Sequence, residues 1–452
     1  MSITSLLVIS DLHLADGRNA LEGFCFPQQS AFEEFLRAAL PGGSLQIPSP
    51  PTLIINGDCF DFLAVPPYPA DGLTTPALGL EKLAQIAAVH ERFFAALRAF
   101  LDQGGKLTFL IGNHDIELCF AEVRAEVTRL LDPTGIFAAH LHFCLDQAYQ
   151  PVPDVSIEHG NQYDFWNSTR AIWNRNGKAL TPEPERIELP LGTQYVQRAS
   201  LPIGLRYPYF ERFNPPLGIP RQMALLSLLD PPLVREMARG IAGLLSNGHQ
   251  ALQGLAPGDE GVPVHIFSHM MSDFAHFQQE MQARVPTWAT MEKHLYPVNE
   301  RLQKQAYTLD TFFALGTALE QSRETALQAI FKPFDETGDE DTTRGIHRML
   351  RKHPEVRVAV AGHTHITRSD LSAAHGQLYL NTATWTHRLA PPRPEELTPE
   401  VVAWLGQPDL EHAPLTSKTG YVFAWINTET GQPSSARLCE WQGGSSGSYR
   451  VL

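Results

Sequence analysis

The fold of this chain is constrained most by short apolar runs that alternate with segments whose apolar residues recur at helical spacing. Residues 3–9, 52–56 and 106–111 are apolar and partly β-branched, which is typical of buried strands. A capping box at Ser30–Glu33 predicts a helix between the first two runs, and apolar residues at helical spacing over 83–101 predict a longer one before the third. This alternation predicts an α/β fold built in layers.

Composition and charge exclude several classes of protein. The chain has 452 residues and a net charge of −14, which disfavours stable binding to nucleic-acid backbones. Its five cysteines are odd in number and form no C-x-x-C pair, which suits a reducing compartment. The apolar run at residues 6–9 is too short to predict a secretory leader, and no run of 18 apolar residues predicts a transmembrane helix. We therefore expect a cytoplasmic protein without a transmembrane segment.

A change in character marks an internal segment. From residue 164 to residue 353, proline-rich joints separate stretches of helical periodicity, such as 233–245 and 309–330. Strand-like runs then return at 356–361, 377–382, 420–426 and 435–441. The sequence thus predicts a mostly helical cap over 164–353, inserted into a core formed by residues 1–163 and 354–452.

Five short motifs concentrate side chains that bind metals, and most of them directly follow a predicted strand. The motifs are Asp11-Leu12-His13, Gly57-Asp58-Cys59-Phe60-Asp61, Gly112-Asn113-His114-Asp115, Glu158-His159-Gly160-Asn161 and Gly362-His363-Thr364-His365. Strand ends at one edge of an α/β sheet bring distant segments together. Carboxylate oxygens combined with imidazole nitrogens suit Mn, Fe or Zn better than Ca. One aspartate could bridge two such ions about 3.5–4 Å apart.

Each feature also has a plainer interpretation. Any one motif alone could be a polar loop or turn. Five such motifs in this order along the chain are poorly explained in that way. Arg18 and Arg170 could each bind a phosphate or be solvated surface residues. Tyr163 and Trp166 could line a substrate pocket or belong to the core.

The order D-x-H, G-D-x-x-D, G-N-H-D, H-G and G-H-x-H resembles the calcineurin-like metallophosphoesterases. The resemblance covers about residues 3–164 and 354–388. It implies a four-layer α-β-β-α sandwich with two mixed sheets and a centre of two divalent transition-metal ions, whether Mn, Fe or Zn. The implied ligands are Asp11, His13 and His365 for the first ion, Asn113, His159 and His363 for the second, and Asp58 as the bridge between them.

The resemblance also implies how the site would act. His114 matches a histidine that faces the leaving group, and Asp61 matches the carboxylate that orients this histidine. A hydroxide activated by both metals would attack phosphorus. The predicted function is therefore metal-dependent hydrolysis of a phosphate ester in a small-molecule or lipid-linked substrate whose identity the sequence leaves open, as it does the oligomeric state.

Two alternatives stay open at this point. The first is a pyrophosphatase that acts on a nucleotide-linked lipid or sugar, like the UDP-diacylglucosamine hydrolases, which share a helical insertion. That branch usually has Arg in place of His114 and Asp in place of Asn161. The second alternative, a non-catalytic scaffold, is disfavoured because all seven ligand positions and His114 are present.

Overall fold

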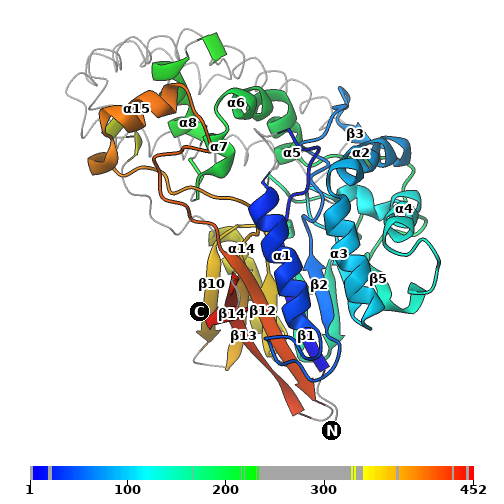
Figure 1. The fold of residues 1–452 in the computed structure, drawn as a ribbon. Coiled ribbons are helices and arrows are strands. Elements are labelled where there is room, and N and C mark those ends of the chain that lie inside the picture. The colour runs from blue at the N-terminus through cyan, green and yellow to red at the C-terminus, as the bar shows by residue number, and fades with distance from the viewer. Residues whose placement is uncertain are drawn as a thin grey trace. The chain divides into compact units, whose positions relative to one another are not determined.

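The computed structural model describes most of the chain, which divides into two compact units (Figure 1). The described residues are 4–18, 23–164, 166–169, 171–214, 216–217, 219–230, 232–233, 327–328, 330–331, 340–372, 376–429, 432–443 and 447–452. The first unit comprises Met1–Thr193, Thr337–Arg388 and Lys418–Leu452, and the second Gln194–Glu336 and Leu389–Ser417. The predicted helical stretches over 234–245 and 309–326 lie outside the described residues.

A seven-stranded mixed sheet forms one half of the first unit. Its strand order is β14-β13-β12-β1-β2-β4-β5. The strands are β1 Thr4–Ile9, β2 Thr52–Asn56, β4 Lys106–Leu110, β5 Leu141–Cys144, β12 Tyr421–Glu429, β13 Gln432–Gly443 and β14 Ser448–Val451. β1, β2, β4 and β5 run parallel, whereas β12, β13 and β14 are joined in antiparallel pairs. The carboxyl ends of β1, β2 and β4 therefore lie at one edge.

A five-stranded mixed sheet forms the other half, in the order β10-β11-β9-β7-β6. Its strands are β6 Ala148–Val152, β7 Val155–Glu158, β9 Val358–Ala361, β10 Thr367–Ser372 and β11 Gln377–Thr382. β7, β9 and β11 are parallel, and the two outer strands pair antiparallel. A separate ribbon pairs β3 Leu73–Thr74 with β8 Ile187–Glu188. The predicted α/β class with mixed sheets is confirmed.

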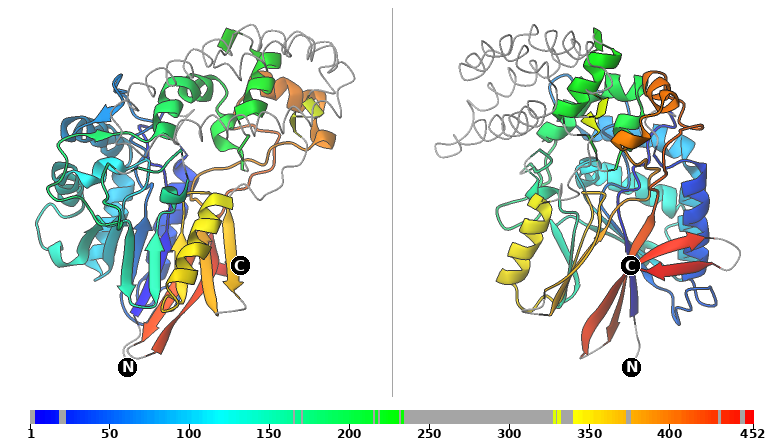
Figure 2. Two further views of the ribbon diagram at one scale, coloured as in Figure 1. Left: turned by 180° about the vertical axis from the view of Figure 1, so that it is seen from behind. Right: turned by 90° about the vertical axis from the view of Figure 1, so that its left-hand side faces the viewer.

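Helices cover the sheets on their outer sides, with α1 (blue) and α14 (yellow) on opposite sides in Figure 2. The helices of this unit are α1 Phe26–Ala39, α2 Pro76–Val89, α3 Glu91–Asp102, α4 Ala121–Leu131 and α14 Glu340–Lys352, with short 3₁₀ helices η1 Ile116–Cys119, η2 Ala138–His140 and η3 Asn161–Tyr163. Residues alternate between the two faces of a strand. Leu7 of β1 joins a buried cluster with Phe35 of α1, whereas Val8 joins a cluster with Val360 of β9. The apolar core thus lies on both faces of the large sheet.

Two helix predictions need correction. Helix α1 begins at Phe26 rather than at the capping box of Ser30, because Pro27 fits the first turn and the helix therefore starts earlier. The helix predicted over 83–101 is two helices, α2 and α3, which meet at His90. The His90 amide donates to the carbonyl of Ile86 and its carbonyl accepts from the amide of Phe93, so this residue ends one helix and begins the next.

The named elements of the second unit are helices, joined by irregular segments in which Leu389 forms isolated bridges with Phe213 and Ser417. Its helices are α5 Leu191–Tyr195 (shared with the end of the first unit), the short helix Val196–Ser200, α6 Leu201–Arg206, α7 Tyr209–Arg212, α8 Ile219–Leu229, the 3₁₀ helix η5 Pro394–Glu396 and α15 Pro399–Gly406. Tyr209 lies against Trp404 with ring centres 5.3 Å apart, and its hydroxyl donates to the carbonyl of Leu405 at 2.9 Å. The described parts of this unit therefore share one aromatic core.

The compact units divide the chain at other points than the predicted cap. The ends of the predicted insertion belong to the first unit, because β8 pairs with β3 and α14 packs on β11. Residues 389–417 join the second unit instead. A cap over 164–353 stays a prediction.

In the part of the chain that the structure describes, no helix has both the length and the apolar character needed to cross a bilayer.

The aromatic core on α1 gives a stability prediction. Phe35 is fully buried against Trp385 and Phe423, whereas Phe26 on the same helix is 71% exposed. Phe35→Ala should destabilise the protein by about 3–5 kcal/mol, because a buried ring is replaced by a cavity. The matched control, Phe26→Ala, should cost less than about 1 kcal/mol. Urea unfolding followed by tryptophan fluorescence measures both changes, and equal losses would show that α1 is packed differently.

Candidate metal centre

The loops that follow β1 and β2 are held side by side by backbone hydrogen bonds. The amide of Asp11 donates to the carbonyl of Gly57 at 3.2 Å, and the amide of His13 donates to that of Asp58 at 3.0 Å. The parallel pairing of β1 with β2 continues into the loops in this way. These main-chain bonds therefore hold the residues Asp11, His13 and Asp58 side by side.

The backbone is strained at five residues whose side chains are predicted metal ligands. Asp11, His13, Asp58, His363 and His365 all have φ between 51° and 70°, in the left-handed region that side chains other than glycine seldom adopt. The structure describes only two further non-glycine residues of this kind. Strain of about 1–3 kcal/mol per residue is typical of functional sites.

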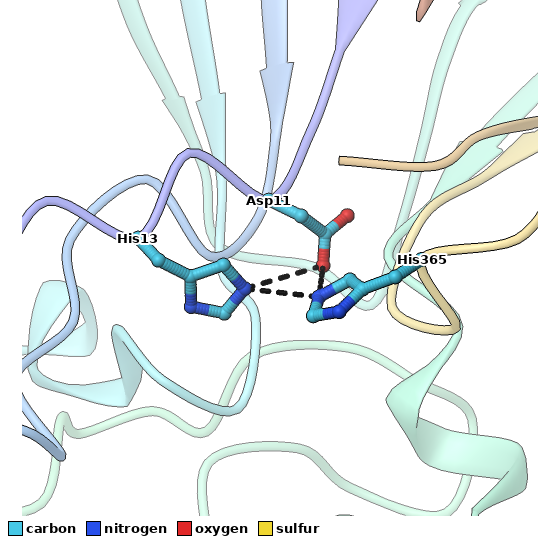
Figure 3. A group of neighbouring side chains, drawn as sticks. All are labelled: Asp11, His13 and His365. Atoms are coloured by element: carbon cyan, nitrogen blue, oxygen red, sulfur yellow. Dashed lines mark hydrogen bonds and ion pairs between the residues drawn. The ribbon is translucent and has the colours of Figure 1, made fainter. Parts of the chain in front are cut away.

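A first group of side chains converges from two distant segments (Figure 3). The Oδ1 atom of Asp11 lies 3.1 Å from Nε2 of His365 and 3.7 Å from Nε2 of His13. The two Nε2 atoms are 3.0 Å apart. Three potential ligand atoms thus surround one point, the arrangement expected of a cation site.

A second group adjoins the first through Asp58. The Oδ2 atom of Asp58 lies 3.2 Å from Nε2 of His159, and His363 completes this group. The same oxygen lies 3.9 Å from Nε2 of His13 in the first group. Asp58 therefore stands between the two groups, as a bridging ligand must.

Two buried polar atoms of the proposed ligands make no hydrogen bond. They are Oδ1 of Asn113 and Nε2 of His159. Buried acceptors are almost always satisfied, by protein or by something bound. The other ring nitrogen of His159, Nδ1, has a hydrogen-bond partner, because it donates to the carbonyl of Asn56 at 2.8 Å. The residues present therefore fit divalent cations, which would supply the missing partner of both atoms.

The electrostatics of the site favour positive charge. Burial alone would lower the pKa of His13, but hydrogen bonds to Asp11 and Asp61 raise it to about 10. Likewise, Asp58 outweighs burial and raises the pKa of His159 to about 9. The pKa of Asp58 itself is held well below its usual range by these histidines, against the effect of burial. Buried carboxylates of this kind need cations nearby.

His114 pairs with Asp61 and also lies in a third group, with His13 and Asp58. Nδ1 of His114 lies 2.9 Å from Oδ1 of Asp61, and the amide of His114 donates to Oδ1 of Asp58. Burial would lower the pKa of His114, but the charge of Asp61 raises it. The His114 side chain is 23% exposed, against 1% for His159. A substrate can thus reach His114, as it can His365, whose side chain is equally exposed.

Asp115 organises the site from behind. Its two oxygens accept from the amides of Gly112 and Cys59, at 2.6 and 2.8 Å, and so tie the loop after β4 to the loop after β2. Burial, together with the charge of Asp58, raises its pKa to about 7. Asp115 supports the loops that carry Asp58 and Asn113.

The residues predicted to contact substrate are placed differently from one another. Arg18 donates hydrogen bonds to Asp16, to the carbonyl of Ala64 and to the hydroxyl of Tyr68, all within the protein itself. The hydroxyl of Tyr163 donates to Glu158, and its ring lies against Gly345 of α14. The amide of Trp166 donates to Asp164 and its carbonyl accepts from Gly192. Arg170 lies outside the described residues. Substrate contact by these residues stays a prediction.

Two charged residues that touch the histidines were not predicted. Asp164 lies 3.1 Å from Nε2 of His363, and Arg388 lies 2.8 Å from Nδ1 of His365. Asp164 follows His159 by five positions in the sequence, but a single sequence gives that spacing no meaning. Arg388 carries no motif at all. Only the folded chain brings these groups to the site.

Comparison with known protein families gives a match to the first part of the chain. Residues 4–194 match the sequence profile of the family described as calcineurin-like phosphoesterase. This range contains Asp11, His13, Asp58, Asn113 and His159. Members of this family typically use divalent metals, in agreement with the His and Asp groups of the structure. No similar protein was found among curated proteins.

The close approach of Gly57 to His159 gives a prediction. A Cβ at Gly57 would clash with Nδ1 of His159, and the φ of this glycine is +78°. Gly42 has a similar φ of +85° but nothing within 4 Å. Gly57→Ala should therefore displace His159 and lower bound metal at least about tenfold, since a displaced ligand no longer binds. Gly42→Ala should keep its metal at a cost of about 1 kcal/mol in stability. Metal content per chain, measured by emission spectroscopy, separates the two, and a fully loaded Gly57→Ala would contradict the placement.

Proposed function

Because residues 4–194 match the calcineurin-like phosphoesterase family, we propose that this chain hydrolyses a phosphate ester with two divalent transition-metal ions. The observation that carries the proposal is the convergence of Asp11, Asp58 and three histidine-bearing loops, where two buried ligand atoms make no hydrogen bond. No simple structural role accounts for this, because clustered carboxylates and strained backbone both cost stability.

The seven proposed ligands would divide between two ions. Asp11, His13 and His365 would hold one ion, Asn113, His159 and His363 would hold the other, and Asp58 would bridge them. When bound, such ions supply Lewis-acid stabilisation of a phosphoryl group and lower the pKa of water. Four of the seven proposed ligands are imidazoles, which favours Mn, Fe or Zn over Mg or Ca.

His114 and Asp61 would act on the leaving group. The ionised carboxylate of Asp61 only accepts, so Nδ1 of His114 donates to it. This bond fixes the ring and leaves Nε2 for the substrate. The raised pKa of His114 keeps a proton available at that atom. Nε2 would donate this proton to the departing oxygen, a step that general acids accelerate by about 10²–10⁴-fold.

The role of Asp58 tests the proposal as a whole. We expect the metal-loaded protein to hydrolyse at least one substrate in a panel of an aryl monoester, an aryl diester, a nucleotide diphosphate-sugar and a cyclic nucleotide. Asp58→Asn should lose most of the bound metal and the activity, because a neutral amide cannot balance two divalent cations. Asp102→Asn, at an exposed position, is the control for the same change. Full loading and activity of Asp58→Asn would refute the bridging role.

The role of His114 is tested by the leaving group. His114→Ala should keep its metal but lose activity about 10²–10⁴-fold towards an alkyl ester. The loss should be smaller for an aryl ester, whose leaving group needs little protonation. His142→Ala, an exposed histidine on β5, should change neither rate. Measuring kcat/KM for both esters decides the matter, and equal losses on the two would argue against proton donation.

A further inference from the structure

The two histidines of the G-H-x-H motif each have one ring nitrogen beside a charged side chain, and the two charges are opposite. Nε2 of His363 lies 3.1 Å from Oδ2 of Asp164, a carboxylate. Nδ1 of His365 lies 2.8 Å from a terminal guanidinium nitrogen of Arg388, a cation. The two imidazoles have the same chemistry, so the difference between them comes from these neighbours.

The carboxylate prepares His363 to bind a cation. A carboxylate only accepts, so Nε2 of His363 carries the ring hydrogen and Nδ1 keeps its lone pair. Asp164 is held in turn by the amide of Trp166 at 2.9 Å and by Nδ2 of Asn167 at 2.6 Å. A carboxylate behind a histidine fixes the ring and makes it a stronger ligand. His159 is prepared in the same way, by the carbonyl of Asn56.

The guanidinium has the opposite effect on His365. Arginine only donates, so Nδ1 of His365 accepts and the ring hydrogen is on Nε2, which donates to Asp11 at 3.1 Å. That nitrogen is the one that faces Asp11 and His13. Binding a cation there requires the hydrogen to leave Nε2, and moving it to Nδ1 would set it against a donor. The positive charge of Arg388 also opposes a second positive charge.

We propose that the two cation sites are unequal, with Asp164 making the site of Asp58, His159 and His363 the tighter one and Arg388 making the site of Asp11, His13 and His365 the weaker one. This inference rests on the proposed function only for the identity of the two sites. It means that the chain holds one ion firmly, while the supply of free metal sets the occupancy of the other. Since the proposed reaction uses both ions, activity would follow the weaker site.

Titration of the metal-free protein with Mn²⁺ by calorimetry tests the inequality without any substrate. We expect two binding steps that differ in affinity. Asp164→Asn keeps an acceptor for the turn at Trp166 but removes the charge, and it should weaken the tighter step by about 10–100-fold. Arg388→Gln should strengthen the weaker step by about tenfold, because it removes a charge and offers a carbonyl to Nδ1.

Two matched variants control for general effects of charge. Asp146→Asn removes a carboxylate that pairs with Lys178, and Arg92→Gln removes an arginine that pairs with Glu33. Both pairs lie outside the two ligand groups, and both variants should titrate like the unmodified protein. Circular dichroism of the metal-free variants checks that each is folded.

Several outcomes would overturn the inference. They are two equal steps in the unmodified protein, an Asp164→Asn variant with an unchanged tighter step, and an Arg388→Gln variant with a weaker or unchanged second step. Because the change at Arg388 is expected to improve binding, misfolding of the other variant cannot hide the result. A protein with two unequal sites that hydrolyses nothing in the panel would refute the proposed function alone. Hydrolysis with two equal sites would refute this inference alone.

Discussion

Two aspartates, Asp11 and Asp58, are buried around a single imidazole, and the rest of the site depends on balancing their charge. They are 0% and 1% exposed, and each has a carboxylate oxygen within 4 Å of Nε2 of His13. An uncompensated buried carboxylate is strongly unfavourable, so the fold must provide cations or attract them. The raised pKa of His13 and of His159 shows that the surrounding potential draws positive charge. Divalent cations at the same place would meet this need more fully than two protonated rings.

Holding these groups together requires backbone that most residues avoid, and tight packing of main chain around them. A Cβ at Gly112 would clash with Oδ1 of Asp58, and one at Gly362 would meet Oδ2 of Asp11 at 2.5 Å. The motif glycines are therefore required by close approach as well as by turning. The strain is balanced by the parallel sheet and by the bonds that join one loop to the next, including the amide of His363 to Asp11 at 3.0 Å. A site of this kind is maintained at a cost in stability that the large core can support.

The partners of each histidine decide what that histidine can do. His114 faces a carboxylate and is partly exposed, which suits proton transfer to a bound substrate. His159 and His363 donate to acceptors behind them, which suits metal binding. His365 accepts a hydrogen bond from Arg388, and this bond opposes metal binding by His365. Chemically identical imidazoles thus differ in their suitability for proton transfer or metal binding because their hydrogen-bond partners differ. The unequal sites inferred above are one consequence of this arrangement.

The sequence by itself determined the α/β class and most of the strands, because period and composition are local properties. The strands β2 and β11 coincide with their predicted bounds, and β1 and β4 differ from theirs by one residue at one end. Motif order also predicted that the aspartates and histidines of these motifs meet, since each motif follows the end of a strand, and Asp11, Asp58, His13, His159, His363 and His365 do lie in neighbouring groups. Local pattern did not reveal the break at His90 or the early start of α1, because hydrogen bonds and a proline in the first turn decide these. Nor could it reveal Asp164 behind His363, which is 199 residues away, or Arg388 behind His365. Contacts between charged side chains from separate loops depend on how the loops lie in space, so only the tertiary structure decided them.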